Sequence, residues 1–271
     1  MRKTFTLTRG ATHVDMLPTV AKFGFTLAET LITLGIIGVV AALTIPGLIN
    51  KCRHIILKNQ FKKSVALVNQ IIRRTKANMD IETFATYCTD YNKQYINRET
   101  CISELLNNRS TKSKITKKPG TGVYYDIDRS NDVIKNYTGK QRATYSDFGN
   151  HGFQRTLYYT VAMADGQYIN YWIENKELYI PVDINGSAKP NRLGHDIFIF
   201  TVSKKDDSLQ GITVNFSGND DDPDYWGNQT TGNPCNLTST QKGNGIGCAQ
   251  YALKDKCPHN NTQGYFECLP K

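Results

Sequence analysis

An apolar stretch near the N-terminus constrains the fold of this 271-residue chain more than any other feature. From Phe25 to Ile45, about twenty residues in a row carry a single charge, that of Glu29. A helix rises about 1.5 Å per residue, so a helix of this length crosses a hydrocarbon core of roughly 30 Å. The sequence therefore predicts one transmembrane helix.

Glu29 is the unusual residue of this predicted helix. A carboxylate inside a membrane segment costs a few kcal/mol, so a partner for it is expected. If the chain were cleaved after Gly24, Phe25 would carry a free amine. Glu29 of one subunit could then pair with the amine of a neighbour, which would neutralise both charges in apolar surroundings.

The segment KFGFTLAETL, from Lys22 to Leu31, resembles the class III signal of type IV prepilins and type II secretion pseudopilins. That family has a basic leader ending in Gly, an aromatic first mature residue, a Glu at mature position five and an apolar helix. The resemblance implies cleavage by a prepilin peptidase between Gly24 and Phe25, N-methylation of Phe25 and a role for Glu29 in assembly. The alternative is an ordinary signal anchor, in which Glu29 occurs by chance.

The resemblance and the residue pattern together predict five segments. These are a leader at 1–24, a transmembrane helix at 25–45, an amphipathic continuation of this spine helix at 46–78, a globular pilin-like head at 79–216 and a Cys/Gly/Asn-rich region at 217–271. Either Met1 or Met16 begins the leader. Basic residues flank both sides of the helix, so charge does not orient it. The resemblance places the leader in the cytoplasm and the head outside.

At Pro46-Gly47, where the apolar run ends, proline predicts a kink or a local loss of helix in the spine helix. Beyond this point apolar residues recur at helical spacing and form one stripe: Leu57, Phe61, Val65, Val68 and Ile72. Such a stripe is expected to pack on a sheet. The opposite side carries basic residues expected to face water: Lys62, Lys63, Arg73 and Lys76.

The sequence predicts a β-sheet in the middle of the chain, at residues 120–216. Runs rich in β-branched and aromatic residues predict strands at Val123–Ile127, Thr156–Ala164, Gln167–Ile173, Glu177–Ile184, Asp196–Val202 and Ile212–Phe216. Asp165-Gly166 is a hairpin signal. Short turns indicate an antiparallel meander, and a helix followed by strands predicts an α+β fold. A short helix is expected at Ile102–Leu106.

Seven cysteines are spaced too widely for a zinc knuckle, and in an exported domain they favour disulfides. Cys88 and Cys101 are expected to close one loop. The four C-terminal cysteines are expected to form two bridges, with three connectivities left open: Cys235, Cys248, Cys257 and Cys268. Cys52 remains, and we expect it to be a small buried hydrophobic residue.

The loop between two predicted strands, from Asp183 to Asp196, resembles a hairpin loop of pseudopilin-like heads. Oxygens of Asp183, Asn185 and Asp196 could bind calcium, although the loop departs from the EF-hand pattern. The alternative, which we favour, is a turn in which these side chains cap the loop's own amides. A weaker acidic cluster lies at 220–224. No other cofactor is expected.

The distribution of basic residues argues against nucleic acid as a partner. The formal net charge is +9, of which the leader contributes +3. The most basic loop, 107–118, has no aromatic residue among its cations, whereas single-strand binders combine the two. We expect a solvated loop, with a minor pilin that binds DNA as the alternative.

No nucleophile–base pair, phosphate loop or metal motif predicts an enzyme. By resemblance, the chain is expected to be a structural subunit of a type II secretion pseudopilus or a type IV pilus. Its partners would be the prepilin peptidase, other subunits and the bacterial inner membrane, crossed once with the head in the periplasm or on the cell surface. The alternative is a membrane-anchored extracytoplasmic binding module that does not polymerise.

Overall fold

The computed structural model describes residues 24–90, 116–117, 124–125, 127–128, 133–140, 142–143, 159–163, 165–174, 176–212, 235–240 and 243–270. The chain divides into two compact units, Met1–Ile49 and Asn50–Lys271. Helix α1 (Leu27–Met79) begins in the first unit and continues into the second.

The first unit confirms a helix that is long and apolar enough to cross a membrane. Its large apolar side chains have no protein cover, and Phe25 and Leu43 expose 84% and 78% of their surface. An exposed apolar surface of this extent is compatible with a membrane-spanning helix. In the part of the chain that the structure describes, this is the one helix that meets both criteria.

The predicted local loss of helix at Pro46 does not occur, because α1 remains helical through this residue, whereas the alternative expected there, a kink, stays a prediction. Proline removes one N–H donor from the helix and crowds the carbonyl four residues earlier. Long helical segments continue on both sides, and extending an existing helix is far easier than starting a new one. Losing a single hydrogen bond is therefore tolerated here.

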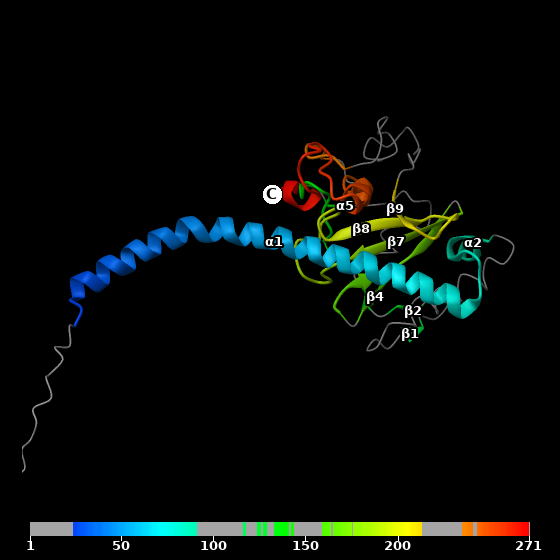
Figure 1. Ribbon diagram of the computed structural model, residues 1–271, viewed down its shortest axis with the longest axis horizontal. Coiled ribbons are helices and arrows are strands. Elements are labelled where there is room, and N and C mark those ends of the chain that lie inside the picture. Colours follow the sequence, from blue (N-terminus) through cyan, green and yellow to red (C-terminus); the bar gives the residue numbers. More distant parts are fainter. Residues whose placement is uncertain are drawn as a thin grey trace, which may run out of the picture. The chain divides into compact units, whose positions relative to one another are not determined.

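The second unit is an α+β structure in which α1 lies across an antiparallel sheet (Figure 1). The sheet order is β3-β4-β5-β7-β8-β9, and β6 also pairs with β7. The strands are β3 (Ile127–Asp128), β4 (Tyr159–Ala162), β5 (Tyr168–Ile169), β6 (Trp172–Glu174), β7 (Glu177–Asp183), β8 (Ile197–Val202) and β9 (Leu209–Gly211). A separate pair joins β1 (Thr116–Lys117) and β2 (Tyr124–Tyr125).

The centre of the sheet is the β7–β8 hairpin, whose register pairs Tyr179 with Thr201 and Asp183 with Ile197. β5 and β6 pair with successive parts of β7, so the predicted strand Gln167–Ile173 is present in two pieces. Of the predicted strand at Ile212–Phe216, only Ile212 is described, and it follows the end of β9 at Gly211 without belonging to a strand. Residues 213–216 lie outside the described residues, as does the predicted helix at 102–106.

The apolar stripe of α1 packs on the sheet as predicted. Leu57, Phe61, Val68 and Ile72 are buried, and Val65 is partly buried against the same core. The Phe61 ring meets the rings of Phe198 at 4.6 Å, Phe266 at 5.5 Å and Phe200 at 5.9 Å between centroids. Aromatic contacts of this kind add to the stabilisation from apolar burial.

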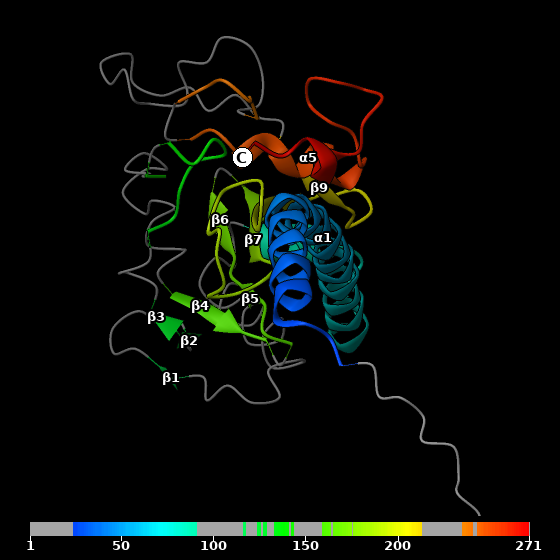
Figure 2. The ribbon, with the colours of Figure 1, turned by 90° about the vertical axis from the view of Figure 1, so that its left-hand side faces the viewer.

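The C-terminal region forms a third layer, made of η4 (Ile246–Cys248), α5 (Ala249–Leu253) and η5 (Tyr265–Cys268) (Figure 2). Gly211 of β9 allows this layer to approach closely, because a Cβ there would lie 2.2 Å from the Gln250 nitrogen. Two disulfides hold the region, Cys235–Cys248 and Cys257–Cys268. This resolves the connectivity that the sequence leaves open.

Two other cysteine predictions have different outcomes. Cys88 lies in the short helix α2 (Phe84–Thr89) and is disulfide-bonded, whereas its predicted partner Cys101 lies outside the described residues. The prediction of a buried Cys52 is wrong, because Cys52 is a free and exposed cysteine. Its helix buries Leu57 and Phe61, and Cys52 does not share their face.

Asp207, in the turn between β8 and β9, connects three elements. Its carboxylate accepts hydrogen bonds from the Phe84 and Ala85 amides at 3.0 and 2.9 Å, at the start of α2. The Lys76 ammonium, in the last turn of α1, lies 3.2 Å from the same carboxylate. Asp207 has a left-handed φ of 57°, a conformation that Asp and Asn tolerate better than most residues.

We predict that Asp207→Ala lowers the free energy of unfolding by about 2–4 kcal/mol, because two buried amides and Lys76 lose their acceptor. Asp207→Asn, which tolerates the same backbone conformation, should cost less. Urea unfolding of the full chain in detergent micelles measures both. Lys205→Ala, at an exposed position of the same turn, is the control and should stay within about 0.5 kcal/mol of the wild type. An equal loss for Asp207→Ala and Lys205→Ala would contradict this account.

Candidate functional site

The predicted processing segment lies at the start of α1, and its geometry is a capping box. The Thr26 amide and hydroxyl donate to Glu29 Oε2 at 2.8 and 2.9 Å. In return, the Glu29 amide donates to Thr26 Oγ1 at 3.2 Å. Thr26 and Glu29 thus satisfy donors at the helix start that would otherwise lack partners.

This arrangement gives Glu29 a local partner within a single chain. In apolar surroundings an acceptor without a donor is costly, and the two hydrogen bonds from Thr26 reduce that cost. The Thr-x-x-Glu spacing is visible in the sequence and could have predicted this box. The capping box and the predicted pairing with a neighbour's amine use the same carboxylate.

The predicted cleavage position is open. Nothing lies within 4 Å of the position that a Cβ of Gly24 would occupy, and Phe25 is exposed. A peptidase that recognises Gly24 and Phe25 would meet residues outside the helix, because α1 begins only at Leu27. The structure therefore leaves the scissile bond accessible, and cleavage itself stays a prediction.

Of the three predicted metal ligands, Asp183 is the last residue of β7, and Asn185 and Asp196 lie in the β7–β8 loop, where Asp196 caps the backbone. Its two carboxylate oxygens accept the Asn191 and Arg192 amides, both at 2.7 Å. Burial raises the pKa of Asp196 to about 6, while hydrogen bonds from these amides and from the Asn185 side chain act in the opposite direction. The geometry is that of the structural turn favoured from the sequence.

The other two predicted ligands lie where β7 passes into this loop. Asp183 Oδ1 accepts the Asn185 amide at 3.3 Å, and Asn185 Nδ2 donates to the Lys189 carbonyl at 3.3 Å. In the described parts of the chain, no group of three His, Cys, Asp or Glu side chains is arranged to hold a metal ion. A calcium ion would have to compete with the amides for Asp196, and calcium binding stays a prediction.

Next to this loop lies a buried cluster that the sequence patterns did not predict. His195 Nε2 is 3.0 Å from the Tyr137 carbonyl oxygen, so a neutral ring donates its proton there. The Tyr265 hydroxyl donates to the Gly194 carbonyl at 2.6 Å. Gly194 has a φ of 75°, and a Cβ there would lie 2.8 Å from Cys248 Sγ. No sequence signal links positions 137, 195 and 265, because only the fold brings them together.

Burial, followed by the charge of Arg192, lowers the pKa of His195 to about 3 from an ordinary value of 6.5. The hydrogen bond to the Tyr137 carbonyl acts in the opposite direction, and the charges of Arg53 and His54 lower the pKa further. These cations therefore surround His195. The cluster is a neutral, buried link between the β7–β8 loop and the C-terminal region.

This cluster predicts a loss of stability in acid. Below pH 6.5 the unfolded chain protonates His195 while the folded chain does not, so stability falls until the pH reaches about 3. Asp196 opposes this trend between about 6 and 3.8, because its pKa is raised in the folded state. His195→Asn should remove the histidine contribution, seen as a shallower decline of unfolding free energy with falling pH.

Urea unfolding from pH 7 to pH 4 gives the required slopes. The control is Lys205→Ala, at an exposed position of the β8–β9 turn, which should keep the wild-type slope. If His195→Asn and wild type declined in parallel, the buried neutral histidine would not be responsible.

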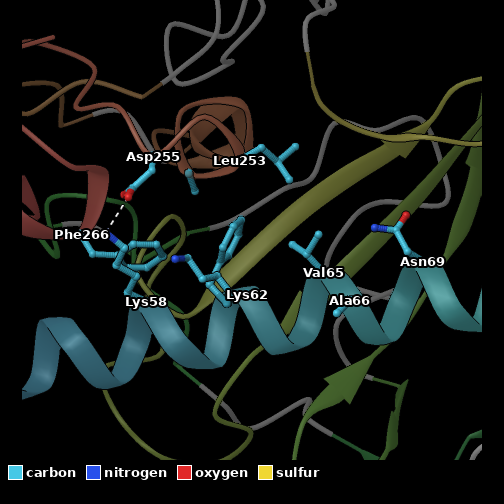
Figure 3. A pocket seen from close by; sticks show the side chains of 10 residues that line it. Lys58, Lys62, Val65, Ala66, Asn69, Leu253, Asp255 and Phe266 are labelled. Carbon is cyan, nitrogen blue, oxygen red and sulfur yellow. Dashed lines mark ion pairs between the residues drawn. The ribbon is translucent and has the colours of Figure 1, made fainter.

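A cavity of about 350 Å³ lies between α1 and the C-terminal layer (Figure 3). Val65, Ala66 and Leu253 contribute aliphatic lining, and Lys58 forms an ion pair with Asp255 at the rim. The lining offers apolar contact and one further ammonium, that of Lys62. The remaining lining residues are Phe61, Asn69, Ala252 and Phe266.

Two further predictions fall on parts of the chain outside the described residues. The acidic cluster at 220–224 lies there, and so does most of the basic loop 107–118, of which only Thr116–Lys117 is described. DNA binding through that loop stays a prediction. Comparison with protein-family models, curated protein sequences and solved structures gives no match to this chain.

Proposed function

We propose that this chain is a prepilin-class subunit of a filament, in a type II secretion pseudopilus or a type IV pilus. The observation that carries the proposal is the segment Gly24–Glu29, in which an accessible Gly–Phe bond precedes a carboxylate at the start of an exposed apolar helix. Prepilin peptidase would cleave after Gly24, and the new amine of Phe25 would be methylated.

The two halves of α1 support this proposal in different ways. The half from Leu27 to Ile49 exposes apolar side chains. These side chains could contact lipid in the membrane and the helices of neighbouring subunits after assembly. The half that carries Leu57 to Ile72 anchors the helix to a folded α+β head. In this proposal the protein crosses the inner membrane once, with the disulfide-bonded head outside the cytoplasm.

Assembly would exchange the partner of Glu29. In the single subunit, Thr26 satisfies the carboxylate. In the filament, the amine of a neighbouring Phe25 would replace or join this bond, giving a charge-neutral pair in apolar surroundings. A membrane-anchored binding module that does not polymerise would need only the capping box.

Glu29 variants separate these two functions. Glutamine at this position can complete a capping box but carries no charge. We predict that Glu29→Gln and Glu29→Lys both lower incorporation into sheared filaments by roughly a hundredfold, because each removes the charge pair. Quantitative immunoblotting of the filament and membrane fractions measures this, and the amount in the membrane should not change.

Glu82→Lys, an exposed charge reversal in the head, is the matched control and should assemble normally. If Glu29→Gln assembled like wild type while Glu29→Lys did not, helix capping and not charge pairing would be the role of Glu29 in assembly. If both variants behaved like wild type, the binding-module alternative would replace the filament proposal.

A further inference from the structure

One end of the second unit gathers exposed cations. Lys63 of α1 pairs with Asp165 in the β4–β5 turn, and Lys76 pairs with Asp207 in the β8–β9 turn. The helix therefore runs along the sheet from the first turn to the second, a rise of about 20 Å. Arg53, which precedes Lys63, belongs to the end marked by the β4–β5 turn.

The β7–β8 loop lies at this same end. A Cβ on Gly186 would be 2.3 Å from the Gly166 carbonyl oxygen, so the loop backbone touches the β4–β5 turn. The segment 133–143 joins the loop through two hydrogen bonds of 2.9 Å, from the Lys135 amide to the Asn191 carbonyl and from the Leu193 amide to the Lys135 carbonyl. These segments therefore lie at the same end of the sheet as Lys63 of α1.

We call the cations of this surface the basic collar: Arg53, Lys135, Lys140, Arg142, Lys189 and Arg192. All are exposed except Arg192, which is partly exposed. Backbone bridges hold Lys135 beside Arg142 and Arg192. Lys63 of α1 pairs with Asp165, and Gly186 of the β7–β8 loop approaches Gly166 in the same turn, so the α1 part and the loop part of the collar lie at the same end of the sheet.

The described acidic groups at this end do not neutralise the collar. Asp165 and Asp255 pair with Lys63 and Lys58. Asp183 and Asp196 are buried, whereas Glu267 is exposed and its carboxylate accepts the Gly264 amide. Among the described residues at this end, the six cations of the collar outnumber the exposed carboxylate of Glu267, so this surface carries a net positive charge, which attracts anions.

The position of the collar along the chain indicates which anion it meets. Arg53 follows Phe25 by 28 residues, about 42 Å of helix, and a bilayer with its headgroups is about 40–45 Å thick. A membrane helix that starts at Phe25 thus delivers Arg53 to the phosphate level of the opposite surface. Exposed Ile55 and Ile56 continue the apolar surface there.

We infer that the basic collar binds the headgroups of anionic phospholipids and holds the head against the membrane from which α1 emerges. Lysine and arginine side chains near an anionic bilayer each add to the attraction, which decays within a Debye length. The inference depends on the membrane helix and not on polymerisation, so it holds or fails independently of the filament proposal.

The test uses the full chain in nanodiscs and a fluorophore on one introduced cysteine. Cys52→Ser first removes the free thiol. Ser187→Cys places the label on an exposed, uncharged position of the β7–β8 loop, and Ala77→Cys places it near the distant end of α1. Lipids with a nitroxide headgroup quench a label that lies at the bilayer surface.

We expect quenching of the Ser187→Cys label to rise roughly twofold or more when phosphatidylglycerol replaces part of the phosphatidylcholine, and to fall again at high salt. The Ala77→Cys label should not respond. Lys135→Glu with Arg142→Glu should abolish the rise. Arg73→Glu with Arg74→Glu, an equal charge change at exposed positions of α1, should preserve it.

Three results would overturn the inference. The first is equal quenching of the Ser187→Cys label in both lipid compositions. The second is a rise in quenching that persists in the protein with Lys135→Glu and Arg142→Glu. The third is quenching that does not depend on anionic lipid, together with binding of duplex DNA by the protein in phosphatidylcholine nanodiscs. In that case the same double variant would lose its affinity for DNA. Thermal unfolding of each variant verifies that the head remains folded.

Discussion

The burial of one face of α1 on the sheet is the interaction on which the second unit depends. Leu57, Phe61, Val68 and Ile72 are buried together with Phe198 and Phe200 of β8. The C-terminal layer completes this core through Phe266 and Tyr265. Without the α1 stripe, both the sheet and the disulfide-bonded layer would expose aromatic surface to water.

The same helix carries a second apolar surface that finds no cover in its own chain. From Phe25 to Ile49 the large apolar side chains are exposed, whereas the stripe that begins at Leu57 is buried. Polar interactions also hold the packed half, notably the ion pair between Lys76, in the last turn of α1, and the Asp207 carboxylate, which also accepts the Ala85 amide. In the proposed function this exposed half of α1 lies in the membrane, and Glu29 is the acid that the membrane would have to accommodate.

Sequence periodicity was enough to predict the α1 stripe and the β7–β8 hairpin, because helical spacing and β-branched runs are local signals. A loss of helix at Pro46 is not observed, because the helix on both sides of this residue outweighs one local breaker. Sequence periodicity missed β9 and the His195 cluster. Leu209–Gly211 is too short and polar to show a strand pattern, and His195 meets Tyr137 and Tyr265 only through tertiary contacts.

In the proposed function, Gly24 ends a leader peptide and Phe25 is the first residue of the mature protein. Intact-mass analysis and N-terminal sequencing of the chain from a host with a prepilin peptidase test this directly. The account predicts a mature chain that starts at N-methylated Phe25, and an uncleaved chain in a host without the peptidase. An uncut chain in both hosts, or a cut at another bond, would contradict the prepilin assignment.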